Sequence, residues 1–135
     1  MSNGRHAVLA AIYDLLMGDA ALVAMLGEGR IFDRPRRHEA MPLITFGRLT
    51  TERDRSDGPV VQTHTLDMDV FGDQSRAQVS EICEIIVDHL DEVQLNAVGY
   101  KVILVRHLST TIEMSRDLRS YRGRNRFRFL TEKLS

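Results

Sequence analysis

The apolar and polar positions from Thr63 to Leu95 predict a strand, a turn and a long helix. Leu66, Met68 and Val70 alternate with Asp67, Asp69 and Phe71. A period of two is typical of a strand with one buried face. After Gly72 the period changes to the i, i+3, i+4, i+7 spacing of an amphipathic helix. The apolar residues with that spacing are Val79, Ile82, Cys83, Ile86, Leu90 and Val93.

The start of this helix is indicated by Ser75 and Gln78, which have the spacing of a capping box. We therefore expect a helix from about Ser75 to Val93 that covers a small sheet. Its opposite side carries acidic residues, which we interpret as a solvated face. These residues are Glu81, Glu84, Asp88 and Asp91.

The same reasoning predicts the remaining elements. Two short helices are expected, at Arg5–Met17 and from Asp19 to Leu26, with Asp19 as the cap of the second. Strands are expected at Arg30–Asp33 (a brief edge strand), Leu43–Leu49, Val60–Phe71, Tyr100–Leu108 and Ser120–Thr131. The consecutive apolar residues of the strand from Tyr100 predict that it is central or covered on both sides. Ser109–Asp117 is expected to be a bend or a bulged strand.

This order of elements predicts an α+β fold in one domain spanning residues 1–135. We expect a mostly antiparallel sheet of about four strands, with a long helix and one or two shorter N-terminal helices packed on one face. The segment Thr50–Pro59 is predicted to be a loop, because it has charges and turn residues but no apolar side chain before its end. It is longer than most hairpin loops, and such loops often make contacts.

Composition adds few constraints. Hydrophobic content of 43% and charged content of 27% are those of an ordinary globular protein. The single cysteine, Cys83, lies on the apolar stripe of the long helix, where we expect a small buried side chain rather than a nucleophile. Tyr13, Asp14 and Asp19 interrupt the apolar N-terminal segment, so we predict no membrane span and no signal peptide, and expect synthesis in the cytosol.

Charge is distributed unevenly along the chain. Residues 51–95 contain 11 acidic and 3 basic residues, whereas residues 116–135 contain 7 basic and 2 acidic ones. These two regions should attract each other, either within one subunit or between two.

The last predicted strand carries four arginines on one face, and its other face is mostly apolar or small. The arginines are Arg122, Arg124, Arg126 and Arg128. Three interpretations remain open for them. They could pair with Asp67 and Asp69 across strands, bind phosphates of a nucleic acid, or dock an acidic surface of another subunit. The pI of about 6.5 argues against non-specific DNA binding.

A catalytic or metal site is not predicted. Asp67 and Asp69 share a strand face, but strand parity places His64 on the opposite face with Leu66 and Met68. HExxH, CxxC, DxDxDG, GxSxG, P-loop and GxGxxG motifs do not occur. We therefore expect no enzymatic activity, no metal and no cofactor.

The succession of segments resembles the tail terminator, or tail completion, family of long-tailed bacteriophages. The resemblance is carried by the N-terminal helix, AALVAMLGEGRIFDRPRRHEAMPLITFGRLT, HTLDMDVFGDQSRAQVSEICEII and YRGRNRFRF, which together cover nearly the whole chain. The length and the arginine-rich end also resemble the version found in bacterial gene transfer agents.

The resemblance implies a structural protein of a phage-like particle. Members form hexameric rings on the head-proximal end of the tail tube, end tube growth and join the tail to the head connector or stopper protein, while DNA passes through the ring. Expected partners are further copies of the chain, the major tail tube protein and that connector or stopper; no membrane is involved.

A ring needs two different complementary patches on each subunit. The candidate interface residues are Arg122, Arg124, Arg126, Arg128, Asp67, Asp69, Glu52, Arg53, Asp54 and Arg55. The alternative is a small nucleic-acid-binding module that uses the strand from Arg122 to Arg128.

Overall fold

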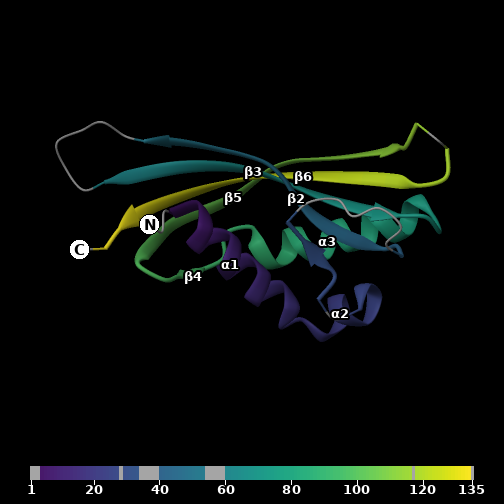
Figure 1. The fold of residues 1–135 in the computed structure, drawn as a ribbon, viewed down its shortest axis with the longest axis horizontal. Coiled ribbons are helices and arrows are strands. Elements are labelled where there is room, and N and C mark those ends of the chain that lie inside the picture. Colours follow the sequence, from purple (N-terminus) through teal and green to yellow (C-terminus); the bar gives the residue numbers. More distant parts are fainter. Residues whose placement is uncertain (1–3, 28, 34–39, 54–59, 117, 135) are drawn as a thin grey trace.

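The computed structural model describes residues 4–27, 29–33, 40–53, 60–116 and 118–134. It contains three helices and a six-stranded sheet (Figure 1). The helices are α1 (Gly4–Met17), α2 (Ala20–Leu26) and α3 (Arg76–Leu90). The strands are β1 (Ile31–Phe32), β2 (Leu43–Arg53), β3 (Val61–Gly72), β4 (Asn96–Ala97), β5 (Tyr100–Met114) and β6 (Tyr121–Lys133).

The sheet has the strand order β1-β2-β3-β6-β5-β4. All neighbouring strands are antiparallel except β1 and β2, which are parallel. The α+β class and a mostly antiparallel sheet are confirmed, but the predicted number of about four strands is wrong, since the sheet has six. The short edge strand near Ile31 was expected, whereas β4 was not, because a strand of two residues carries no period that could be read from the sequence.

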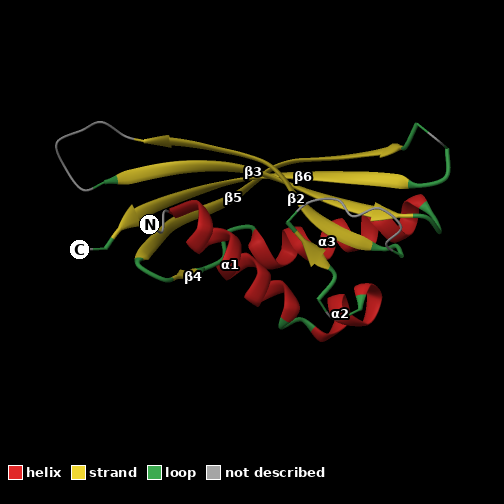
Figure 2. Ribbon diagram, viewed as in Figure 1, coloured by secondary structure: helices red, strands yellow, loops and turns green. Residues whose placement is uncertain are grey.

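All three helices lie on one side of the sheet, and the other side has no covering layer among the described residues (Figure 2). The core lies between the two layers, and β3 and β6 contribute Leu66, Met68, Val70, Phe127 and Phe129 to it. We call the two sides the helix-covered face and the open face. The β2–β3 and β5–β6 hairpins lie at opposite ends of the sheet (Figure 1).

The long helix α3 packs as its period predicts. Val79, Ile82, Cys83, Ile86 and Leu90 are all buried. At its start the side chain of Ser75 accepts a hydrogen bond from the backbone N–H of Gln78. The helix ends at Leu90, with Asp91 as its C-cap, which is earlier than the predicted end.

Two glycines of neighbouring strands let α3 approach the sheet. A Cβ atom at Gly123 would lie 2.6 Å from Sγ of Cys83 and 2.8 Å from Val79, and one at Gly72 would also lie 2.8 Å from Val79. Such distances are too short for real side chains. The close contact of helix and sheet at Val79 therefore depends on the absence of side chains at these two positions.

Several predicted strand ends were wrong. β2 continues to Arg53, so Thr50–Arg53 belongs to a strand rather than a loop. β5 continues to Met114, with register shifts between Val102 and Leu104 and between His107 and Ser109, so the predicted bulged strand is part of one long strand. An open sheet face accepts polar residues, and for that reason polarity did not mark the strand ends.

The prediction for β5 had two alternatives. β5 lies between β6 and β4 in the sheet, but Ile103 is 46% exposed, so coverage on both sides is wrong. Residues 54–59, which include the candidates Asp54 and Arg55 and the rest of the predicted loop, lie outside the described residues.

Candidate functional site

The open face is built by every second residue of the long strands. On β6, Gly123, Asn125, Phe127 and Phe129 are buried beneath the helices, whereas the four arginines alternate with them and lie on the open face. The predicted division of β6 into two faces is thus confirmed.

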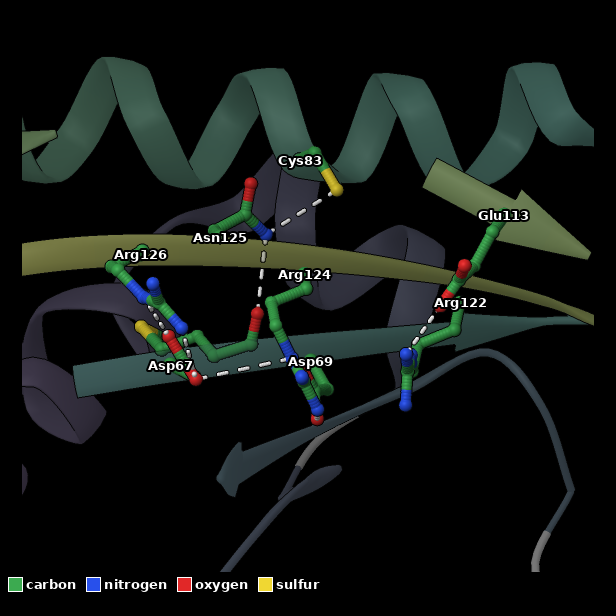
Figure 3. A network of polar contacts seen from close by, with 9 residues as sticks. Asp67, Asp69, Cys83, Glu113, Arg122, Arg124, Asn125 and Arg126 are labelled. Atoms are coloured by element: carbon green, nitrogen blue, oxygen red, sulfur yellow. Dashed lines mark hydrogen bonds and ion pairs between the residues drawn. The ribbon is translucent and has the colours of Figure 1, made fainter. Parts of the chain in front are cut away.

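Two of the arginines form ion pairs with aspartates of the same chain. Arg126 lies directly opposite Asp67, and Arg124 lies directly opposite Asp69. The Nε and Nη2 atoms of Arg126 donate to the two carboxylate oxygens of Asp67 at 2.8 and 3.2 Å, and those of Arg124 donate to Asp69 at 2.9 and 3.2 Å (Figure 3). Such bidentate, charge-assisted pairs are strong and fix the plane of the guanidinium group.

Both carboxylates are largely buried, with side chains of Asp67 and Asp69 only 4% and 9% exposed. The hydrogen bonds to Asp69 and Asp67 raise the pKa of Arg124 and Arg126, respectively, above that of a free arginine side chain. The first of the three interpretations of the arginine strand therefore describes these two arginines: they pair with Asp67 and Asp69 across strands, inside one chain.

Arg122 pairs with Glu113 of β5, which lies directly opposite it (Figure 3). Arg128 differs from the other three, because its cross-strand neighbours are Thr65 on β3 and Arg106 on β5. Neither Arg128 nor Arg106 has an ion pair with another described residue. The four arginines that look equivalent in the sequence are thus three paired groups and one that faces a fifth arginine.

The sequence alone did not identify Glu113 and Arg106 as the cross-strand neighbours of Arg122 and Arg128. Strand alternation does indicate that Arg106 shares a face with Leu104. It could not have placed either residue opposite a given arginine, because two register shifts in β5 change the pairing with β6.

His64 lies on the helix-covered face, apart from Asp67 and Asp69, as parity predicts. It is fully buried, with Nδ1 at 2.9 Å from Oγ1 of Thr51 and Nε2 at 3.0 Å from Oγ1 of Thr131. In either neutral tautomer one ring nitrogen donates to a threonine hydroxyl and the other accepts. Burial, with a smaller contribution from Arg5, lowers the pKa of His64, so the ring is held neutral.

Asn125 connects the helix-covered face of β6 to α3 by a hydrogen bond. The sequence did not indicate this role. Its Nδ2 donates to the carbonyl of Met68 and to Sγ of Cys83, each at 3.3 Å (Figure 3). Its Oδ1 accepts from Oγ1 of Thr110 at 2.8 Å. Burial raises the pKa of the Cys83 thiol, which keeps it protonated and unreactive.

A small hollow of about 190 Å³ lies on the open face beside the Asp67–Arg126 pair. It is lined by Arg48, Thr50, Thr65, Asp67 and Arg126. The candidates Glu52 and Arg53 lie at the end of β2, opposite Thr63 and Gln62, and both are exposed. They belong to the β2–β3 hairpin, outside this hollow.

In the part of the chain that the structure describes, no group of three or more His, Cys, Asp or Glu residues could hold a metal ion. None of its helices is by itself long and apolar enough to cross a membrane. The bent pair α1–α2 meets that condition on length and composition.

Two of three comparisons place the chain among known proteins. A sequence model of the family described as tail completion protein gp17 matches residues 10–132. A solved structure described as the virion of a native gene transfer agent particle contains a similar chain with a TM-score of 0.87 and 19% identity; the match covers 98% of this chain and 99% of that one. No curated protein matches the chain. This chain belongs to the tail completion protein gp17 family and is a structural component of the tail of a phage-like particle.

Proposed function

We propose that the chain forms a ring on the head-proximal end of a phage-like tail tube. In this position it ends tube elongation and joins the tail to the head connector or stopper protein, and DNA passes through the ring. The observation that carries the proposal is the family match, which spans residues 10–132 and so includes every strand of the open face that bears the candidate interface. The protein has a structural role and no catalytic one.

The architecture supports this role physically. A ring-forming subunit needs two different patches for its neighbours and further surfaces for the tube and the connector. The open face offers polar, charged surface along four long strands, and the β2–β3 and β5–β6 hairpins lie at opposite ends of the sheet (Figure 1). Glu52 and Arg53 lie in the β2–β3 hairpin.

The paired arginines also fit an interface. The side chains of Arg124 and Arg126 are 39% and 45% exposed although both are bound to aspartates. A guanidinium group has five N–H donors, of which each pair uses two. The aspartates thus hold the two groups in place, and the remaining donors are directed to a partner together with Arg122 and Arg128.

Electron microscopy of particles made with and without the protein tests the proposal. Producer cells that lack it should yield heads without tails and tails of uncontrolled length, and complementation should restore joined particles with a six-fold ring at the junction. If joined particles of normal tail length formed without the protein, the proposal would be wrong.

A nucleic-acid-binding module is the second candidate, and Arg106 and Arg128 favour it because neither has an ion pair with a described residue. It requires a monomer that binds duplex DNA with an affinity that falls steeply with salt. Weak binding of DNA at physiological salt, together with ring formation in particles, would exclude this candidate.

A further inference from the structure

Among the described residues, the open face contains an electrostatically unfavourable contact between two strands. Arg106 of β5 and Arg128 of β6 are directly opposite each other, and both are exposed. Like charges in this arrangement destabilise a sheet. The other three arginines of β6 each have a carboxylate partner, whereas these two have none among the described residues. The other arginines of β6 are neutralised by carboxylates, so positive charge remains at Arg128 and at its neighbour Arg106.

A second unfavourable arrangement, of opposite sign, lies on α3. Glu81, Glu84 and Asp88 are exposed along one line of the helix and have no ion pair with another described residue. Like charges at i and i+4, as in Glu84 and Asp88, destabilise a helix. Asp88 also lies in the last turn, where the helix dipole favours a positive charge.

Glu84 and Asp88 border a hollow of about 310 Å³ between α3 and β5. Ser80, Cys83, Val87, His107, Thr110 and Ile112 complete its lining. The two carboxylates therefore stand at the rim of a depression that could receive the long side chains of a docking surface, rather than on a flat part of the helix.

We propose that Arg106 and Arg128 of one copy dock onto Glu84 and Asp88 of the next copy. The spacing fits, because Cβ atoms of directly opposite strand residues lie about 4.5–5.5 Å apart and those at i and i+4 of a helix about 5–6 Å apart. Each contact would remove both like-charge repulsions. The inference rests on the proposed ring function and specifies one contact of that ring.

The two patches lie on different layers of the subunit, one on the open sheet face and one on α3. Joining them produces a head-to-tail contact, which is the kind of contact that closes a ring. An acidic patch of the same chain fits the arginine pair better than a phosphate backbone does. The chain has a net charge of −1, and its exposed acidic helix face would repel DNA.

Cysteine cross-linking tests the contact directly. A chain with Arg128→Cys and Asp88→Cys is incorporated into particles and treated with a short bismaleimide. Cys83 lines the same hollow as Asp88, so both changes are made together with Cys83→Ser. The chain with Cys83→Ser alone should stay monomeric on a denaturing gel, as should each single variant, whereas the double variant should give a ladder of multimers. Absence of this ladder from assembled particles would overturn the proposal.

Charge reversal provides the second test. Arg106→Glu with Arg128→Glu should reduce the yield of joined particles by about tenfold or more, the factor that corresponds to about 1.4 kcal/mol. Glu84→Arg with Asp88→Arg should do the same. The chain that carries all four changes should recover, since the opposite charges again face each other. Recovery is the outcome that a general loss of stability cannot produce.

A matched control is Lys101→Glu with Lys133→Glu, the same change of charge on the same two strands at exposed positions. It should leave joining near the normal level. Thermal melts of all variants check folding, and Arg106→Gln with Arg128→Gln replaces the reversed pair if that pair unfolds.

The two proposals can fail separately. Normal joining by the charge-reversed variants, or a loss of joining that the four changes together do not restore, would overturn this contact and leave the ring function intact. If joining did not require the protein at all, the ring function would be wrong, and cross-linking of the purified protein would still decide whether the contact exists. Loss of DNA binding in the arginine variants, together with absence of the cross-link, would assign the pair to phosphate instead.

Discussion

Successive residues of the central strands β3 and β6 alternate between two faces of the sheet, and the side chains on the two faces have different roles. On the helix-covered face, Leu66, Met68 and Phe127 are buried in the core, and the polar groups there have hydrogen-bond partners inside the chain. On the open face, Asp67 and Arg126 pair across the strands with one partner still partly exposed. The comparison shows that one face determines stability, whereas the other presents charged groups in fixed positions.

The largest expected difference between the faces comes from Phe127→Ala. Phe127 is fully buried, and truncation should reduce the free energy of unfolding by about 3–5 kcal/mol through lost burial and a cavity. The next residue supplies the control on the open face, because Arg128→Ala should change it by about 0.5 kcal/mol or less. Urea denaturation followed by circular dichroism measures both. Similar losses would show that the open face is covered in the free protein.

A smaller effect is expected where α3 touches the sheet. Gly123→Ala should destabilise by about 1–3 kcal/mol, because the added methyl group forces Cys83 and Val79 away from β6. Gly18→Ala is the matched control, since a Cβ atom there has contacts no closer than 3.4 Å. Thermal melts compare the two. A harmless Gly123→Ala would mean that α3 shifts easily and that the two layers are not tightly packed.

Within the open face, the buried carboxylates should contribute more to the free energy of unfolding than the exposed carboxylate of Glu113. Asp69→Ala removes two hydrogen bonds to Arg124 and should cost about 1–2 kcal/mol. Glu113→Ala removes a partner whose side chain is 55% exposed, and surface pairs contribute about 0–1 kcal/mol. A double-mutant cycle of Asp69 and Arg124 isolates the pair. Equal costs at both sites would contradict the assigned difference in burial.

The smallest expected effect is a pH dependence that belongs to the helix-covered face. The pKa of His64 is lowered below 6.5 in the folded protein, so the unfolded chain takes up a proton first as the pH falls. Stability contributed by neutral His64 is therefore present above pH 6.5 and is lost progressively below it. Unfolding free energies between pH 5 and 8 should show this slope, and His64→Gln should remove it. Replacing exposed His6 with Gln should leave it unchanged.

Much of the fold could be predicted because local patterns specified it. The cap at Asp19 and the start of α3 after Ser75 depend on backbone groups within three residues of the cap. The separation of His64 from Asp67 and Asp69 follows from strand parity alone. The strand ends near Arg53 and Met114 could not be predicted, since polar residues on an open face can continue a strand or form a loop.

The candidate site shows the same division. The sequence by itself determined that the four arginines of β6 share a face, and the charge count correctly suggested Asp67 and Asp69 as partners. Only the tertiary structure decided which arginine meets which carboxylate, and that Arg128 meets Arg106 instead. The physical reason is that side-chain direction is a local property of a strand. Pairing depends on register, which bulges and contacts between distant segments set.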